Sequence, residues 1–334
     1  MPKSKGNHRY HRQELIPDWD QQKLKDAKIL ILGAGATGSF VSVNMVLSGV
    51  GSIILVDYDT IEVSNLNRQL LFHDDDVGKY KADVAVERLK TFNPDIEIIA
   101  FNQAMEKLPR ELIEDVTVVV SCLDNFPGRR WANSLALDLK VPFVTGGMFA
   151  FLGNVQTIIP YETPCFECQP LISQEKLAQA CTPLGKTRKE IQHEEKETPL
   201  PSVSTLSSII GGLMSQEVLK QVLGIGKRVS NYLFYDGLSN AFTELELAKN
   251  PNCPICGENF KLKTVDAIVL NGELVEAFRY RIAFSFGLKD PKIMHKGKYL
   301  KDTAKMDILQ DETIYVLDDN LASPISLIIK HTQN

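Results

Sequence analysis

The chain lacks any long hydrophobic run. No stretch reaches the roughly 18 consecutive apolar residues typical of a membrane-spanning helix. The N-terminal residues MPKSKGNHRYHRQELIPDWD also lack the apolar core of a signal peptide. The sequence therefore predicts a protein with no membrane partner, located in the cytoplasm.

An excess of positive charge is also missing. The 334 residues include 37 Lys and Arg against 42 Asp and Glu, so the formal net charge is −5. Because contact with many phosphate groups requires a basic surface, nucleic acid is not expected as the main partner. Hydrophobic residues, at 44% of the chain, suffice for a sizeable core in about two or three domains.

The chain has only six cysteines. In a cytosolic protein such residues are reduced, metal-bound or reactive rather than joined in disulfides. Four of them form two Cys-x-x-Cys pairs, Cys165 with Cys168 and Cys253 with Cys256. Four thiolates close a tetrahedral site, so the pairs predict one structural Zn²⁺. A redox role is the weaker alternative, because thioredoxin-like motifs occur singly.

The first 150 residues alternate strands with helices. The apolar runs KILIL, SIILV and VTVVVS are separated by helical patterns such as KADVAVERLKTF. This order predicts an α/β fold with a doubly wound, mostly parallel, Rossmann-like sheet. Beyond residue 150 we expect a further strand, a helix over TLSSIIGGLMSQEVLKQVLG and a hairpin around Asp236 and Gly237.

A glycine-rich turn joins the first strand to its helix. Gly33, Gly35 and Gly38 form G-x-G-x-x-G, which lets the backbone approach a phosphate at the positive end of a helix. Asp57 ends the next strand, where a Rossmann site places its ribose-binding carboxylate. Alone, this pattern also suits a dinucleotide oxidoreductase, which we keep as an alternative.

Polar residues then follow Asp57 in the order Asn65, Arg68, Gln69 and Lys81. Farther along, Asp124 and Asn125 come directly after a buried strand. Hydride transfer has little use for two extra cations. A reaction at a triphosphate does, with Arg and Lys neutralising phosphate oxygens and an aspartate holding Mg²⁺. The alternative for Asp124 and Asn125 is a simple helix cap.

Taken together, these motifs resemble those of a known family. RYHRQ, the glycine loop, SNLNRQ, Lys81, the Asp-Asn pair and the two Cys-x-x-Cys motifs occur in the same order in the ubiquitin-activating-type superfamily. That superfamily includes the bacterial adenylyltransferases for thiamin and molybdopterin sulfur carriers. The resemblance covers roughly residues 8 to 260. It implies a homodimer that uses ATP to adenylate a small β-grasp protein ending in Gly-Gly.

The resemblance also implies roles for single residues in the nucleotide site. Asp57 should bind the ribose, while Asn65, Arg68 and Lys81 should bind the phosphates. The glycine loop, Gln69 and Asn125 should complete the ATP site.

Three further residues match family positions with other roles. Asp124 should organise Mg²⁺ and the attacking carboxylate. Arg12 matches an arginine that family dimers insert into the partner's nucleotide site, and Arg129 matches a helix arginine near the site. A solvated surface charge is the alternative for Arg12 and for Lys81.

Two cysteines are left once the zinc ligands are assigned. Cys122 lies at the end of a buried strand and is expected to act as a small apolar residue. Cys181, in ACTPLGK, matches the cysteine that some family members use to form a thioester. It lies in a charged crossover loop, about residues 178 to 204, that is longer than the family spacer.

The resemblance thus leaves several functions open. The leading one is adenylation followed by a thioester on Cys181 and transfer to a conjugating enzyme. The alternative is an adenylyltransferase for a sulfur carrier in molybdopterin synthesis, thiamin synthesis or tRNA thiolation, without a catalytic thioester. A non-enzymatic scaffold is the third, and the retained Arg12, Arg68, Lys81 and Asp124 speak against it.

The C-terminal residues form a separate predicted domain, 261–334, after an adenylation domain of 1–260. Apolar residues repeat every four positions from Leu274 to Phe286, which favours a helix, although alternation also permits a strand. The order of elements resembles a β-grasp, ubiquitin-fold-like domain. Such a domain would recruit a conjugating enzyme; the alternative is a unit that packs on the zinc region.

Overall fold

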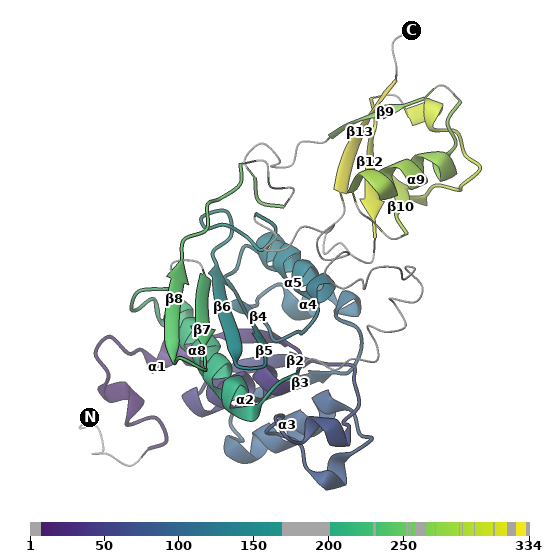
Figure 1. Cartoon of the computed structure of the whole chain (residues 1–334). Coiled ribbons are helices and arrows are strands. Elements are labelled where there is room, and N and C mark those ends of the chain that lie inside the picture. Colours follow the sequence, from purple (N-terminus) through teal and green to yellow (C-terminus); the bar gives the residue numbers. More distant parts are fainter. Residues whose placement is uncertain are drawn as a thin grey trace.

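The computed structural model contains two separate sheets (Figure 1). It describes residues 8–168, 201–229, 232–251, 253, 255–257, 265–270, 272–286, 288, 290–296, 298–309, 311–318 and 325–331. The predicted boundary near residue 260 falls outside these ranges. Among the described helices, none combines the length and apolar character needed to cross a bilayer.

The larger sheet has eight strands in the order β3-β2-β1-β4-β5-β6-β7-β8. The strands are β1 (Lys28–Leu32), β2 (Ser52–Val56), β3 (Glu97–Phe101), β4 (Val118–Ser121), β5 (Phe143–Phe149), β6 (Leu152–Ile158), β7 (Tyr232–Asp236) and β8 (Ala241–Leu245). The first five in this spatial order are parallel, and β6, β7 and β8 are antiparallel to their neighbours. The α/β class and the largely parallel sheet are therefore confirmed.

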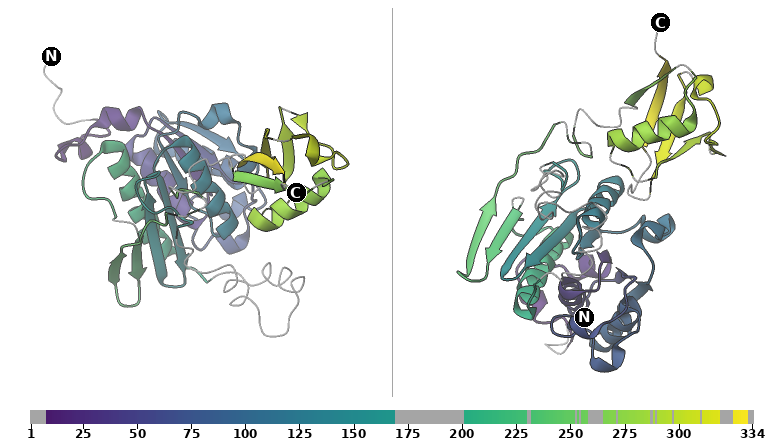
Figure 2. Two further views of the ribbon diagram at one scale, coloured as in Figure 1. Left: turned by 90° about the horizontal axis from the view of Figure 1, so that it is seen from above. Right: turned by 45° about the vertical axis from the view of Figure 1, so that its right-hand side comes forward.

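Helices cover both faces of this sheet. They are α1 (Gln21–Lys25), α2 (Ala36–Ser48), α3 (Lys81–Phe92), α4 (Arg110–Ile113), α5 (Phe126–Leu139) and α8 (Ser204–Leu223). Apolar residues of α2, α3 and α8 form one core with the sheet, and residues of α4 and α5 form a second core on the opposite face. Figure 2 shows α8 and α5 on either side of the strands.

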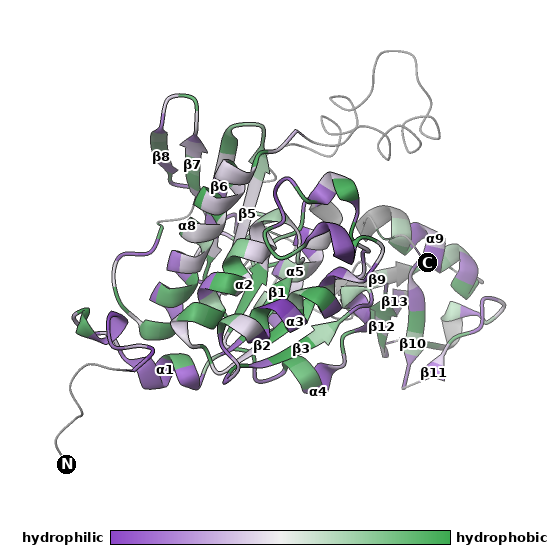
Figure 3. Ribbon diagram, turned by 90° about the horizontal axis from the view of Figure 1, so that it is seen from below, coloured by the Kyte–Doolittle hydropathy of each residue, from purple (hydrophilic) through white to green (hydrophobic). Residues whose placement is uncertain are grey.

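The central strands form because their sequences are apolar and β-branched. In β1, β2 and β4 every residue from the second onward is buried, as expected for parallel strands covered on both faces. Figure 3 shows β1 and β2 in the green of hydrophobic residues, with more purple on the surrounding helices and loops. This packing fixes the carboxyl ends of β1, β2 and β4 next to one another.

The predicted hairpin is also present. β7 and β8 pair antiparallel around a turn that contains Gly237, whose backbone N–H donates to the carbonyl oxygen of Phe151. All five residues of β8 are exposed, and among the described strands β8 is the last of the sheet.

The smaller sheet belongs to the C-terminal region and has the order β11-β10-β12-β13-β9. Its strands are β9 (Val265–Val269), β10 (Lys292–His295), β11 (Lys298–Tyr299), β12 (Thr313–Leu317) and β13 (Ile325–His331). The helix α9 (Val275–Phe286) packs on one face through Val275, Phe278 and Ile282, which confirms the helix favoured by the sequence. The first and last strands, β9 and β13, are parallel neighbours, as in a β-grasp unit, but β9 lies at the edge of the order.

Candidate active site

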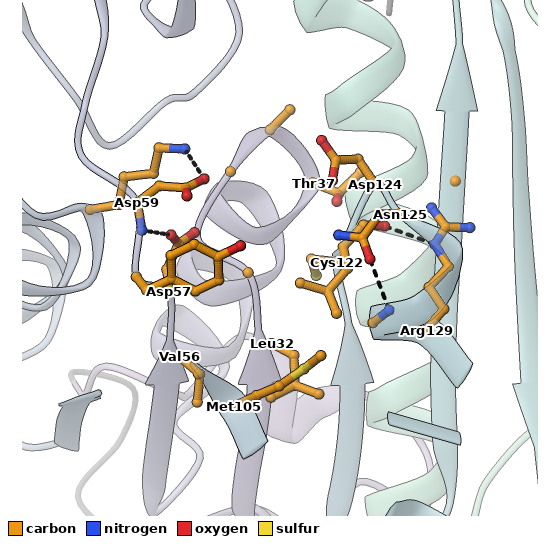
Figure 4. Close-up of a pocket in the computed structure, with 18 of the residues that line it drawn as sticks. Leu32, Thr37, Val56, Asp57, Asp59, Met105, Cys122, Asp124, Asn125 and Arg129 are labelled. Atoms are coloured by element: carbon orange, nitrogen blue, oxygen red, sulfur yellow. Dashed lines mark hydrogen bonds and ion pairs between the residues drawn. The ribbon is translucent and has the colours of Figure 1, made fainter. Parts of the chain in front are cut away.

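A cavity of about 600 Å³ lies at the carboxyl ends of the central strands. Residues from β1, β2 and β5, and from the loops that follow β1, β2 and β4, form most of its walls. In open α/β sheets this is the edge at which ligands bind. Figure 4 shows that Asp57 and Asp59 lie on one side of the cavity, and that Asp124, Asn125 and Arg129 lie on the other.

The three glycines of the loop have different tasks. Gly33 has a φ of +98°, which favours glycine, and Gly35 lines the cavity. Gly38 does not line the cavity; a Cβ at this position would lie 1.9 Å from the carbonyl oxygen of Gly33. The loop can therefore turn tightly onto the N-terminus of α2, where the backbone suits an anion.

Asp57 is held in place by the backbone around it. Its two carboxylate oxygens accept hydrogen bonds from the N–H groups of Ala34, at 2.7 Å, and Asp59, at 2.9 Å. Burial raises the pKa of the Asp57 carboxyl, and the charge of Lys81 opposes this shift. Asp57 thus links β2 to the glycine loop beside the cavity.

Lys81 and Arg68 also reach the cavity, as the sequence predicts. The Lys81 ammonium lies 3.0 Å from a carboxylate oxygen of Asp59, and its side chain is only 9% exposed. Sequence reasoning did not single out Asp59, although it stands two residues after Asp57. Arg68 donates to the carbonyl oxygen of Ser64 at 2.6 Å and to the side-chain oxygen of Asn67 at 2.8 Å.

Three further predicted site residues, Gln69, Asn65 and Arg12, differ in their position relative to the cavity. Gln69 lines the cavity, and its buried side-chain oxygen has no hydrogen-bond partner in the described part of the chain. Asn65 does not line it; its side-chain oxygen accepts the N–H of Glu62 and caps a short turn. Arg12 is exposed and lies outside the cavity of its own chain.

The Asp-Asn pair lies beyond the end of β4 and lines the cavity. Asn125 also caps α5, because its side-chain oxygen accepts the N–H of Gly128 at 2.8 Å. Asp124 is exposed to the cavity. The capping alternative is thus correct for Asn125 and compatible with a ligand role for Asp124.

The remaining walls come from residues that the sequence did not single out. One end is apolar, with Leu32, Val56, Met105, Leu123 and Trp131. An apolar slot of this kind suits a planar base. Beside Arg129, the walls are the backbone of Gly146 and Gly147, with Met148 and Ser202. The positions of these wall residues depend on how distant segments pack, so no local sequence motif predicts them.

The two Cys-x-x-Cys pairs meet on the α5 side of the sheet. The four Sγ atoms, from Cys165, Cys168, Cys253 and Cys256, lie within 4.8 Å of one another, and all four residues are buried. Sγ atoms of a tetrahedral zinc site lie about 3.8 Å apart, since Zn–S is about 2.3 Å. The distances of 3.5 Å for Cys165–Cys253 and 3.2 Å for Cys168–Cys256 are shorter than this value and the 4.8 Å limit exceeds it, so the cluster has about the size that such an ion requires.

The cysteine cluster is also bonded to α5. The N–H of Phe166 donates to the side-chain oxygen of Asn133 at 3.1 Å, and Arg130 pairs with Glu167. The hydrogen bond from Cys165 lowers the pKa of the Cys253 thiol, so one thiolate is already favoured in the cluster. The residues therefore suit a structural metal with no open coordination position.

The remaining two cysteines are Cys122, which the structure describes, and Cys181, which lies outside the described residues. Cys122 lines the floor of the cavity, and burial raises its pKa to about 12, so its thiol stays protonated at neutral pH. Cys181 and most of the predicted crossover loop lie outside the described residues.

Comparisons with known proteins agree with this geometry. The model of the ThiF family matches residues 9–255. A sulfur carrier protein adenylyltransferase of Thermus thermophilus is 34% identical over 261 residues, which cover 75% of this chain and 90% of that protein. The catalytic subunit of the NEDD8-activating enzyme E1 of Caenorhabditis elegans is 26% identical, with 92% of this chain and 91% of that protein covered.

Solved structures show the same fold. Escherichia coli MccB crystallised with ATP superimposes with a TM-score of 0.63 at 25% sequence identity. The match covers 77% of this chain and 76% of MccB.

Proposed function

Because the chain belongs to the ThiF family, we propose that it is an adenylyltransferase that uses ATP to activate the C-terminal carboxylate of a small carrier protein. One observation carries the proposal. A single cavity gathers the glycine loop, the predicted ribose acid, two cations and a second acid on the opposite side, namely Gly33, Gly35, Asp57, Arg68, Lys81 and Asp124. This set suits a nucleoside triphosphate better than a nicotinamide dinucleotide.

The chemistry follows from these positions. Asp57 would bind the ribose, while Lys81 and Arg68 would neutralise the phosphates. A carboxylate oxygen of the carrier attacks the α-phosphorus, the bond to the bridging oxygen breaks, and pyrophosphate leaves. The product is an acyl adenylate, and no proton has to be moved. Mg²⁺, held by Asp124, would supply further charge neutralisation.

The sulfur-carrier alternative fits the relatives better than the thioester route. The Thermus thermophilus relative, named for sulfur carrier proteins, is 34% identical, whereas the E1 subunit from Caenorhabditis elegans is 26% identical. We therefore propose a small β-grasp sulfur carrier, ending in Gly-Gly, as the first candidate substrate.

The thioester route is kept as a second candidate for a specific reason. The match to the E1 subunit covers 92% of this chain. Residues 1–255 make up only about 76% of this chain. The match must therefore extend into the C-terminal unit. In this second candidate the thiolate of Cys181 attacks the acyl carbon of the adenylate, a thioester forms and AMP leaves. The C-terminal unit, as a proposed ubiquitin-like domain, would then recruit a conjugating enzyme.

The other proposals concern assembly and metal. An exposed Arg12 outside its own cavity is compatible with a homodimer in which it enters the cavity of the other subunit. The cysteine cluster would hold Zn²⁺ as a structural ion that contributes folding free energy. Free thiols and ATP suit the cytoplasm as the location.

The test is ATP–pyrophosphate exchange. Purified protein with Mg²⁺, ATP and labelled pyrophosphate should form labelled ATP only when a β-grasp carrier ending in Gly-Gly is added. The matched control is the same carrier without its last glycine. Exchange that does not depend on the carrier, or nucleotide binding that prefers NADH to ATP, would refute the proposal.

A further inference from the structure

Asp59 is a charged residue of the cavity to which the proposed function gives no task. It stands three positions after the end of β2 and lines the cavity with Asp57 and Lys81. Its Oδ2 atom lies 3.0 Å from Nζ of Lys81. The side chain of Asp59 is 55% exposed, whereas that of Lys81 is 9% exposed. A nearly buried cation thus has an accessible carboxylate as its partner.

Backbone hydrogen bonds fix the two residues relative to each other. The N–H of Asp59 donates to Oδ1 of Asp57 at 2.9 Å, and the N–H of Lys81 donates to the carbonyl oxygen of Asp59 at 2.9 Å. The N–H of Ile61 donates to the carbonyl oxygen of Lys79, also at 2.9 Å. The first residue of α3 is therefore tied to the segment that follows β2. Figure 4 shows Asp57 and Asp59 next to each other on one side of the cavity.

A fixed backbone does not by itself fix the ammonium of Lys81. The lysine side chain is long and flexible, and holding it in one conformation costs entropy. Burial of an ammonium also costs free energy unless an anion compensates for the lost water. Asp59 compensates for both through a direct contact. It therefore keeps the charge of Lys81 at the cavity wall, where a phosphate would meet it.

The negative charge of Asp59 has an opposite effect as well, because it repels phosphate. Burial raises the pKa of the Asp57 carboxyl, the charge of Lys81 lowers it, and the charge of Asp59 raises it by a smaller amount. The three charges are thus within reach of one another. Because Asp59 is more than half exposed, water and salt weaken its repulsion of phosphate, whereas its contact with Lys81 is direct. We expect the positioning effect to outweigh the repulsion.

We propose that Asp59 is a positioning residue that holds the Lys81 ammonium in place for the phosphates of ATP. The inference rests on the proposed function, which gives Lys81 that task. Asp57 orients Asp59 through its N–H, and Asp59 orients Lys81, so the ribose acid and a phosphate-binding cation belong to one chain of contacts. Since an ammonium has several donors, Lys81 keeps Asp59 as a partner while another N–H bonds a phosphate oxygen.

The test measures two dissociation constants for the full-length protein in the presence of Mg²⁺. One ligand is a non-hydrolysable ATP analogue, and the other is adenosine, which has no phosphate. Lys81→Gln should reduce the preference for the analogue by about tenfold or more, the size of a charge-assisted hydrogen bond. Asp59→Asn should reduce this preference by about threefold or more. Both variants should bind adenosine within about twofold of the wild type.

A double variant shows whether Asp59 acts through Lys81. Asp59→Asn combined with Lys81→Gln should match Lys81→Gln alone within about twofold, because the effects of coupled residues are not additive. Asp59→Glu keeps the charge and should recover part of the preference. The matched control is Asp115→Asn. Asp115 is 66% exposed, pairs with Lys28 at 2.7 Å and does not line the cavity, so the preference should not change.

The outcomes separate the inference from the proposed function. Tighter binding of the analogue by Asp59→Asn would overturn the inference, since repulsion would then outweigh positioning. A further loss on adding Asp59→Asn to Lys81→Gln would also overturn it, because Asp59 would then act on the nucleotide or on Mg²⁺ directly. Equal weakening of adenosine and the analogue would make the role structural and refute the inference. The expected binding results without carrier-dependent pyrophosphate exchange would refute the proposed function and leave the inference standing.

Discussion

In the C-terminal unit several charged side chains pair with one another, whereas two polar groups of the cavity in the larger sheet lack hydrogen-bond partners among the described residues. Arg279 contacts Asp290 and Asp302, and Arg281 contacts Glu273 through two hydrogen bonds. By contrast, Arg129 has two free donor groups and the side-chain oxygen of Gln69 is buried without a partner among the described residues.

This difference shows where ligand chemistry belongs. Polar groups that satisfy each other stabilise a fold, while polar groups that converge unsatisfied on a cavity cost stability and serve a ligand. We therefore assign nucleotide and carrier tail to the larger sheet. We assign to the smaller sheet a role in protein binding or in structural support, which requires no catalytic side chains.

The largest expected effect is at Asp124. Asp124→Ala should lower carrier-dependent exchange by about a hundredfold or more, since it removes an electrostatic contact to the reacting phosphates. Its side chain is exposed, so the melting temperature should stay close to that of the wild type. Asp115→Ala, which removes a surface carboxylate paired with Lys28, is the control. Full activity in Asp124→Ala would disprove the assignment.

A substitution in the hydrophobic core of the C-terminal unit should lower stability and leave exchange activity nearly unchanged, the opposite of Asp124→Ala. Phe278 is fully buried between α9 and its sheet, so Phe278→Ala should destabilise that unit by about 3–5 kcal/mol. Exchange activity should stay near the wild-type value. Limited proteolysis should cut first beyond residue 260, and Tyr280→Ala, at a 73% exposed position of the same helix, should resist it. Loss of exchange in Phe278→Ala would show that the two regions are not independent.

Loss of a cysteine ligand should have a smaller effect, and mainly on stability. Metal analysis of protein purified without chelators should find about one zinc per chain. Cys253→Ser should lose it and be less stable by on the order of 3 kcal/mol, measured by thermal unfolding. Exchange below the new melting temperature should fall less than in Asp124→Ala. Protein that contains no zinc would remove this claim.

The smallest effect is expected for the free thiols. Cys181→Ala should leave exchange unchanged, because adenylation needs no thiol. Under the sulfur-carrier proposal the wild type should form no carrier adduct that thiols cleave. Cys122→Ala controls for general damage to the cavity floor. An adduct that is present in the wild type and absent in Cys181→Ala would instead establish the thioester route.

Features encoded within a few residues could be predicted from the sequence. The glycine loop, the acid at the end of β2 and the two Cys-x-x-Cys motifs can each be recognised from local spacing, and the α/β alternation follows from apolar periodicity. The helix α9 could be favoured over a strand only weakly, because both periods fit Leu274 to Phe286. Burial of its 3–4 spaced positions against the sheet decided the outcome.

Contacts between distant segments could not be predicted. The Lys81–Asp59 pair joins residues 22 positions apart, and the approach of Arg129 to Gly147 depends on how α5 packs on β5. Asn65 was expected at the phosphates but caps a turn outside the cavity wall. Hydrogen-bonding side chains serve caps and ligands equally well, so residue type alone cannot decide between these roles.

The spacing between Gly33 and Gly38 has a consequence for how such an enzyme can diverge. Even a methyl group at Gly38 would strike the carbonyl oxygen of Gly33, and Gly33 itself has a left-handed φ. We therefore expect that a substitution at either glycine disturbs the loop, whereas residues of the neighbouring cavity wall can change without this effect. Changes in substrate preference should therefore come from replacements at positions such as Met148 and Ser202. These residues line the same cavity, and their side chains are not restricted by the close approach found at Gly38.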